Sequence, residues 1–415
     1  MKKIAILLFF TVGFFVHVWA CTGLIAGKQA TVDGSVLVTY SADSHTLYGA
    51  LTSSPAADWP KGSMRSIVEW DTNKPLGEIE QVEHTYAVMG NMNEHQLTVV
   101  ESTWGGRPEL VDTTGIIDYG SLMQLALERA KTAREAIKVM TGLVKKYGYY
   151  SSGESFTIAD PNEAWILDLI GKGPGRRGAV WVAVRIPDDC IAGHANYPRI
   201  HKIPMDDKEN CLYSPDVISF AREMGYFDGL NKDFSFARAY SPADFGALRA
   251  CDARVWSFFR KYDSSMDNYL PYVNGESAEP FPLYVKPSRK LSVQDMKEAM
   301  RDHFEDTPFD MTQDVGAGPF KVPYRFRPMS FEVDGKSYCM ERAIATQQTG
   351  FTLVGQMRNW LPDPVGGVLW FGVDDANTCV YIPMYCGITQ VPECFSPENG
   401  SMYDFSWTSA FWIHN

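Results

Sequence analysis

The sequence predicts an α+β protein in which mainly antiparallel sheets pack with helices. Runs with strand-like composition come first, helical periodicity follows, and strand-like runs return in the last third of the chain. Strands grouped in this way are typical of layered α+β folds. Hydrophobic residues make up 45% and charged residues 21% of the 415 residues, which is the composition of an ordinary globular protein.

The first sheet is predicted to begin directly after residue 20. Two strand-like runs, 22–28 and 35–41, flank a turn that contains Asp33-Gly34, and this dipeptide is a strong hairpin signal. Residues 86–90 and 97–101 form a second predicted strand pair around the polar link 91–95. The N-terminal part of the chain is therefore expected to build sheet before helix.

Two helices are predicted next, followed by further strands. Residues 122–129 carry the first, and Thr132 with Glu135 has the spacing of a capping box that opens the second, which Gly148 ends. A third helix is predicted at 292–303, and the proline-rich residues 270–288 are interpreted as a surface excursion. The later predicted strands are 155–159, 164–169, 180–186, 351–357, 368–373 and 380–383.

Charge and motif content exclude several classes of function. Lys and Arg number 38 against 50 Asp and Glu, a net charge of −12, so the chain has no excess of cations to neutralise nucleic acid. Residues 173–178 match GxGxxG but precede a strand, so a hairpin loop is the better interpretation than a dinucleotide site. GxSxG and HExxH are absent, and the spacing of His194 and His201 fits no zinc motif, so both are interpreted as core or solvated histidines.

Residues 1–20 have the pattern of a cleaved export signal. Lys2 and Lys3 are followed by an apolar run, and Val18-Trp19-Ala20 places small residues at the cleavage positions. About 15 apolar residues are fewer than the roughly 20 that span a bilayer, so a membrane anchor is disfavoured. We therefore expect residues 21–415 to form the mature domain, located in the periplasm or outside the cell.

Cleavage after Ala20 would make Cys21 the first residue of the mature chain. Its thiol and a free α-amine would then share one residue, and an amine with a pKa near 7.7–8.0 can accept the thiol proton near neutral pH. This arrangement is that of an N-terminal nucleophile hydrolase. Two alternatives remain at this point: a lipid-modified cysteine, against which the bulky Trp19 argues, or simply a small residue after the cleavage site.

A set of motifs runs along nearly the whole mature chain: Cys21-Thr22, Gly27-Lys28, 33–35, 40–43, 90–95, 101–103, 118–119, 125–130, 158–160, 195–200, 356–359, 361–363 and 366–372. Together these motifs resemble those of the secreted dipeptidase family, the dipeptidase A and secernin-like proteins. That resemblance implies a four-layer αββα N-terminal nucleophile hydrolase fold, a cysteine-type dipeptidase activity on small peptide substrates, and no cofactor.

Carried over residue by residue, the resemblance makes Cys21 the nucleophile and Asp43 a polar residue that faces it. It implies an oxyanion contact from Asn196, a second from Asn93 through side chain or backbone, and a supporting role for Arg254. Each also has an ordinary structural interpretation: Asp43 and Asn196 in turns, Asn93 as a loop residue and Arg254 as a solvated helix charge. We also consider that the Asp43 carboxylate recognises the ammonium of a dipeptide.

Two features depart from the family pattern. Many members carry arginine three residues before the aspartate, where this chain has Tyr40, and a neutral hydroxyl cannot stabilise a thiolate by charge. The chain also stops in an aromatic run where relatives continue, so we expect a member shortened at its C-terminus.

The resulting prediction is an exported cysteine dipeptidase that forms a thioester on Cys21. The alternatives are an N-acyl amide hydrolase of the penicillin or bile-salt amidase type, and a lipid-anchored binding protein acylated at Cys21. The sequence does not predict the oligomeric state.

Overall fold

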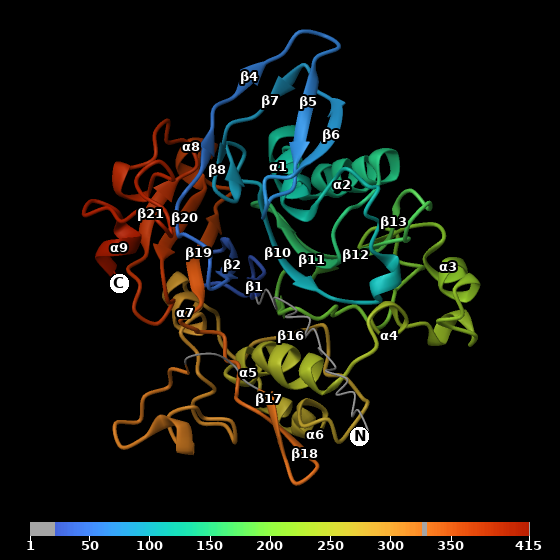
Figure 1. The fold of residues 1–415 in the computed structure, drawn as a ribbon, viewed down its shortest axis with the longest axis vertical. Coiled ribbons are helices and arrows are strands. Elements are labelled where there is room, and N and C mark those ends of the chain that lie inside the picture. The colour runs from blue at the N-terminus through green and yellow to red at the C-terminus, as the bar shows by residue number, and fades with distance from the viewer. Residues whose placement is uncertain (1–20, 326–329, 415) are drawn as a thin grey trace, which may run out of the picture.

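A computed structural model describes residues 21–325 and 330–414 (Figure 1). The predicted export signal at 1–20 lies outside the described residues. The described chain combines two large antiparallel sheets with helices, as the sequence predicts. Among the described residues, no helix has the length and apolar character needed to cross a bilayer.

The first sheet has seven strands, which include both the first and the last strand of the described chain. Each neighbouring pair is antiparallel, including β1 with β2, where Ile25 lies opposite Val38. The strands in spatial order are β16 (Tyr284–Val285), β14 (Ile191–His194), β1 (Gly23–Ala26), β2 (Val36–Asp43), β19 (Thr349–Met357), β20 (Val368–Val373) and β21 (Ile382–Tyr385).

The second sheet has eight strands and is also antiparallel throughout. Its middle strands are long, and every residue of β11 and β12 is buried, so both of their faces are covered. In spatial order the strands are β15 (Cys211–Tyr213), β13 (Ala179–Ile186), β12 (Ala164–Gly171), β11 (Gly153–Ala159), β10 (Thr98–Trp104), β9 (Met92–Asn93), β8 (Val88–Met89) and β3 (Ser53–Ser54).

The two sheets contact each other through β1 and β2 on one side and β10 and β11 on the other. His194 joins them, because its Nδ1 lies 2.6 Å from Ser102 Oγ and its Nε2 lies 2.8 Å from Thr157 Oγ1. The interpretation of His194 as a core histidine is thereby confirmed.

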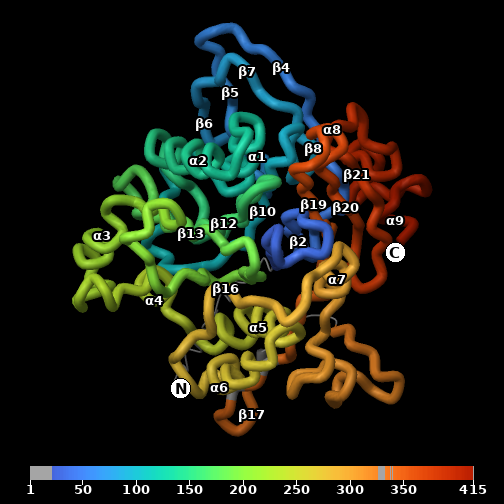
Figure 2. Tube along the Cα trace, turned by 180° about the vertical axis from the view of Figure 1, so that it is seen from behind, coloured from blue at the N-terminus to red at the C-terminus, as the bar shows by residue number. Residues whose placement is uncertain are grey.

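Helices pack against each sheet. Helices α1 (Tyr119–Arg129) and α2 (Ala133–Tyr147) contact β10 to β13, whereas α5 (Ala253–Arg260) contacts β14 and α7 (Val293–Ala299) contacts β2 and β19. Figure 2 shows α1 and α2 well separated from α5, with strands of both sheets between them. The predicted start of α2 is confirmed, since Thr132 Oγ1 accepts a hydrogen bond from the Glu135 backbone N–H at 3.3 Å.

Short elements complete the described chain. Two-stranded antiparallel sheets pair β4 (Ala57–Asp58) with β7 (His84–Thr85), β5 (Met64–Val68) with β6 (Pro75–Glu80), and β17 (Ser330–Val333) with β18 (Lys336–Cys339). Short helices are α3 (Val217–Glu223), α4 (Phe236–Tyr240), α6 (Leu270–Val273), α8 (Asp363–Gly366) and α9 (Ala410–His414). A π-helical turn, Ala247–Asp252, leads into α5, and 3₁₀ turns lie at Pro108–Leu110, Asn231–Asp233, Ser264–Tyr269, Val315–Ala317 and Glu393–Phe395.

The structure differs from the sequence predictions in several places. The proline-rich residues 270–288, interpreted as a surface excursion, bury Tyr272, Val273 and Phe281 and contribute β16 to the first sheet. The runs 86–90 and 97–101 do not pair directly, because tight turns at Gly90 (φ 55°) and Gln96 (φ 63°) fold β9 between β8 and β10. Helix α7 ends before residue 303, since Asp302 is held by Ser257 Oγ (2.7 Å) and Lys261 (2.5 Å). Strand β21 begins two residues later than predicted. The GxGxxG segment is the loop between β12 and β13, as predicted.

Candidate active site

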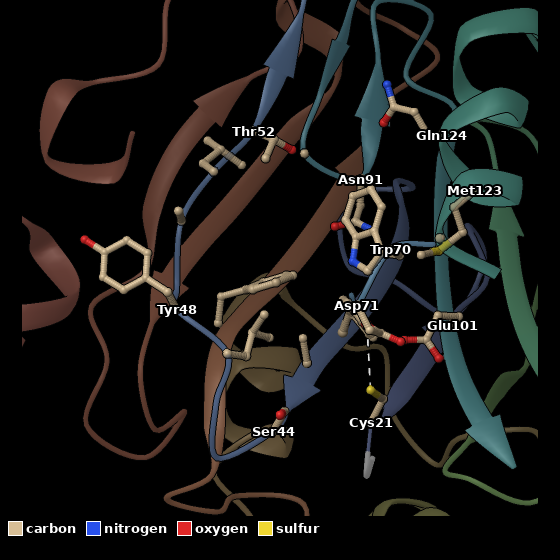
Figure 3. Close-up of a pocket in the computed structure, with 18 of the residues that line it drawn as sticks. Cys21, Ser44, Tyr48, Thr52, Trp70, Asp71, Asn91, Glu101, Met123 and Gln124 are labelled. Carbon is tan, nitrogen blue, oxygen red and sulfur yellow. Dashed lines mark hydrogen bonds between the residues drawn. The ribbon is translucent and has the colours of Figure 1, made fainter. Parts of the chain in front are cut away.

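Cys21 lies at the base of a cavity of about 380 Å³. It lies two residues before the start of β1, and backbone hydrogen bonds between Thr22 and Ser41 tie this end of the chain to β2. Cys21 is 3% exposed. Figure 3 shows its sulfur pointing into the space between Tyr48 on one side and Asp71, Asn91 and Glu101 on the other.

Segments far apart in the sequence build the walls of this cavity. The end of β2 and the loop after it form one wall, and the tip of the β5–β6 hairpin together with α1 forms another. Aromatic rings of β19 and β20 close the remaining side. The lining residues include Tyr40, Ala42, Asp43, Leu47, Tyr48, Trp70, Asp71, Asn91, Glu101, Tyr119, Gly120, Met123, Gln124, Phe351 and Phe371.

The surroundings of the Cys21 thiol favour its protonated form. Burial raises its pKa well above the ordinary value, and the charges of Glu101 and Asp43 raise it further. Two hydrogen bonds act in the opposite direction, one from the Asp43 backbone and one from the Tyr40 hydroxyl, which lies 3.7 Å from Sγ. While residue 21 is joined to Ala20, the side chain is therefore a thiol.

Tyr40 connects the thiol to a pair of buried carboxyl groups. Its hydroxyl donates to Glu101 Oε1 at 2.5 Å, and Glu154 lies beside Glu101, with Thr103 Oγ1 donating to Glu154 at 2.7 Å. Burial raises the pKa of both carboxyls, and the charge of Glu101 raises that of Glu154 further. Two such groups cannot both ionise cheaply at close range, so ionisation of one carboxyl disfavours ionisation of the other.

Asp43 lines the cavity, as expected, but its carboxylate already has partners. Arg342 forms a buried ion pair with Oδ2. The Thr349 hydroxyl donates to Oδ1 at 2.6 Å, and the Ser41 hydroxyl donates to Oδ2 at 3.2 Å. The sequence analysis did not predict Arg342. The positive charge of Arg342 compensates the negative charge of Asp43, which was expected to attract a substrate ammonium.

Arg254 joins the backbone of Cys21 to the side chain of Asn196. One guanidinium nitrogen donates to the Cys21 carbonyl (2.8 Å) and to Thr22 Oγ1 (2.7 Å). The other donates to Asn196 Oδ1 at 2.8 Å and to the Ala195 carbonyl at 3.2 Å. Arg254 is 1% exposed, so the interpretation as a solvated helix charge is wrong. Burial lowers its pKa to about 10.

Asn196 is held with its amide group in one orientation. Its backbone has a left-handed φ of 56°, and its Nδ2 donates to the Thr103 carbonyl at 2.6 Å while Oδ1 faces Arg254. The side chain is thus fixed near Cys21 through Arg254.

The expectation for Asn93 needs correction. Both hydrogens of its Nδ2 go to carbonyls at the end of α1, those of Leu127 and Ala130, each at 2.8 Å, and its backbone N–H donates to the Leu97 carbonyl. These bonds fasten the β9 turn to α1, so Asn93 has no donor for an oxyanion. The nearby Asn91 lines the cavity instead.

Several residues of the site carried no usable signal in the sequence. Trp70 and Asp71 lie at the tip of a hairpin that was not predicted, and Tyr119 reaches the cavity only because α1 packs against that tip. Among the described residues, no cluster of three or more His, Cys, Asp or Glu side chains has the arrangement of a metal site.

Comparison with known proteins agrees with this geometry. The model of peptidase family C69 matches residues 20–415. A protein named probable dipeptidase from Salmonella dublin is 27% identical over 396 residues, which cover 89% of this chain and 81% of that protein. Another probable dipeptidase, from Latilactobacillus sakei, and dipeptidase A from Lactobacillus helveticus are each 24% identical across 95% of this chain and 79% and 80% of their own lengths.

With the buried cysteine at the base of the cavity, these matches define the chain as a hydrolase of the cysteine-peptidase class. It belongs to peptidase family C69, over nearly its whole length. The resemblance found in the sequence motifs is thereby confirmed.

Proposed function

We propose that the mature chain is an exported cysteine dipeptidase whose nucleophile is the thiol of an N-terminal Cys21. The observation that carries the proposal is the position of Cys21 at the base of a 380 Å³ cavity. A cavity of this volume is within the range that encloses small ligands. The names of the relatives, probable dipeptidase and dipeptidase A, support dipeptides as substrates.

The fold supports the same proposal. Helices contact each of two sheets that contact one another, which agrees with a four-layer αββα arrangement of the described residues. In such an arrangement Cys21 lies just before the first strand, where its terminus can reach the space between the sheets. Removal of residues 1–20 during export would create the free amine.

In the proposed reaction the α-amine of Cys21 takes the thiol proton and the thiolate attacks the peptide carbonyl carbon. The C–N bond then breaks, and the amine returns the proton to the leaving amino group. Water, deprotonated by the same amine, attacks the thioester and releases the first amino acid with the restored thiol. Asn196, held by Arg254, is the proposed donor to the oxyanion.

Tyr40 provides a hydrogen bond to sulfur in the position where many relatives are expected to have a cation. The hydroxyl lies 3.7 Å from Sγ and lowers the thiol pKa, in the same direction as a nearby positive charge would. A hydrogen bond is weaker than a full charge, so the α-amine remains the principal base.

The proposal is tested on the protein secreted by its host. Intact mass should show a chain that begins at Cys21 without acyl groups, and this chain should hydrolyse dipeptides faster than tripeptides or N-acyl amino acids. The same chain with a methionine retained before Cys21 should fold but not turn over. An acylated Cys21 would support a lipid-anchored binding protein, and a preference for N-acyl substrates would support an amidase.

A further inference from the structure

The cavity beside Cys21 is acidic. Asp43, Asp71 and Glu101 line it, and none of the described residues that line it is a lysine, arginine or histidine. A cavity with this lining favours a ligand that brings a positive charge. The question is which carboxylate is available to bind that charge.

Two of the three carboxylates are already engaged. Asp43 is buried in its ion pair with Arg342. Glu101 is 2% exposed and accepts the hydroxyl hydrogen of Tyr40. Asp71, in contrast, is partly exposed to solvent, and the Tyr119 hydroxyl donates to its Oδ1 at 2.8 Å.

The hairpin tip that carries Asp71 is fastened to α1. The Trp70 backbone N–H donates to Asp118 Oδ2 at 2.8 Å, and the Ser121 hydroxyl donates to the Val68 carbonyl at 3.2 Å. The Trp70 ring packs on Gly120, where an added Cβ would lie 2.4 Å from the ring. These contacts hold the Asp71 carboxylate in place before any substrate binds.

Figure 3 shows Trp70 and Asp71 on the same side of the cavity as Glu101, above Cys21. Trp70 is about half exposed, so part of its side chain is accessible to a cation. A carboxylate and an indole ring next to each other are the groups that recognise an ammonium in water-accessible sites.

We propose that Asp71, assisted by Trp70, binds the α-ammonium of the substrate and so restricts the enzyme to peptides with a free amino terminus. The inference that the enzyme hydrolyses such peptides rests on the proposed function. The ammonium site is inferred separately, from the contacts that hold the hairpin tip. Partial burial and the neighbouring acids Asp118 and Glu69 raise the pKa of Asp71 to about 6. A bound cation would stabilise the ionised Asp71 carboxylate, which these surroundings disfavour.

The first experiment compares alanyl-alanine with propanoyl-alanine, which differs only by lacking the amino group. In the mature wild type, kcat/KM should favour alanyl-alanine. Asp71→Asn should lower kcat/KM for alanyl-alanine by roughly 10- to 100-fold and leave that for propanoyl-alanine within about twofold. Glu69→Gln is the matched control, because Glu69 is on the same tip but does not line the cavity, and it should keep the wild-type ratio.

Equal losses on both substrates, or no loss on either, would overturn the assignment of Asp71 while leaving the dipeptidase proposal intact. The second experiment measures binding alone, by calorimetry on mature Cys21→Ala protein. Alanyl-alanine should bind more tightly than propanoyl-alanine, and adding Asp71→Asn should remove the difference. If the wild type hydrolyses neither compound, the proposed function fails, and the calorimetry alone decides the ammonium site.

Discussion

The Tyr40 hydroxyl lies 2.5 Å from Glu101 Oε1 and 3.7 Å from Cys21 Sγ. A phenol has one hydrogen to donate, so it serves either the carboxylate or the sulfur at a given moment. When Glu101 is protonated it can donate to the phenol oxygen, which leaves the phenol hydrogen for the thiolate. A proton retained on the buried Glu101 and Glu154 pair would therefore support the ionised nucleophile, and burial raises the pKa of both carboxyls in that direction.

Tyr40→Phe should lower kcat/KM for a dipeptide by about 10- to 100-fold, because a hydrogen bond to a charged atom is lost. The hydrogen bond from Tyr40 lowers the pKa of Cys21, so its removal should move thiolate formation to higher pH. The rate of iodoacetamide labelling at Cys21, measured against pH, reports this shift directly.

The matched control for that variant is Tyr226→Phe. Tyr226 also donates to a carboxylate, Glu109 Oε1 at 2.8 Å, but it does not line the cavity. Its labelling profile at Cys21 should equal that of the wild type. An unchanged profile in Tyr40→Phe would mean that the Tyr40 hydroxyl does not interact with the sulfur in solution.

Processing should change the reactivity of Cys21 more than that of other cysteines. In the chain that retains residue 20, burial and nearby acids raise the Cys21 pKa, so labelling should be slow. In the mature chain the α-amine can accept the proton, and labelling at pH 7 should be faster by an order of magnitude or more. Peptide mass spectrometry of both forms measures the rates.

Cys211 provides the internal reference for this comparison, since burial raises its pKa to about 11 and it lies in β15, away from the cavity. Its labelling rate should be the same in both forms. Equal rates at Cys21 in both forms would argue against the amine as base.

We expect Arg254 to act by holding the Cys21 backbone and the Asn196 side chain in place. Arg254→Ala removes hydrogen bonds to the Cys21 carbonyl and to Asn196 inside the protein and should destabilise the fold by about 3 kcal/mol or more. Arg254→Lys keeps the charge but cannot reach both partners with a planar fork, so the fold should survive while kcat falls more than KM changes.

Arg260→Ala is the control on the same helix. Its ion pair with Asp267 is on the surface, so its loss should cost no more than about 1 kcal/mol and leave kcat unchanged. Thermal unfolding and steady-state kinetics on the three variants separate a role in folding from a role in the site. A kcat for Arg254→Lys equal to that of the wild type would remove Arg254 from the site.

Local signals allowed much of the fold to be predicted from the sequence. The cap of α2 by Thr132 was predictable because the capping hydrogen bond joins residues three positions apart. The hairpin turn with Asp33 and Gly34, which leads from β1 to β2, was predictable because it too depends on residues close in sequence. Cys21 could be selected because its chemistry depends on its place next to a cleavage pattern, which is also local.

The rest of the site depends on contacts that span hundreds of residues. Arg342 pairs with Asp43 from 299 positions away, and no local pattern marks that pairing. Asn91 and Asn93 are two positions apart in one polar link, yet Asn91 lines the cavity while Asn93 is bound to carbonyls at the end of α1. Asp71 becomes a candidate because its hairpin tip packs on α1.

The buried pair of Asp43 with Arg342 leads to the last prediction. Since the charge of Asp43 is compensated and its oxygens accept from Thr349 and Ser41, it should shape the site and not select the substrate. Asp43→Asn should therefore lower kcat/KM by the same factor for alanyl-alanine and propanoyl-alanine, unlike Asp71→Asn. Arg342→Leu leaves a buried carboxylate without its partner and should destabilise the fold by about 3–5 kcal/mol, whereas Asp43→Asn with Arg342→Leu should recover part of that loss. Urea unfolding of the two single variants and the double variant measures this coupling. If Asp43→Asn lowered kcat/KM for alanyl-alanine alone, Asp43 would be the group that binds the substrate ammonium. This result would contradict the reasoning from the ion pair.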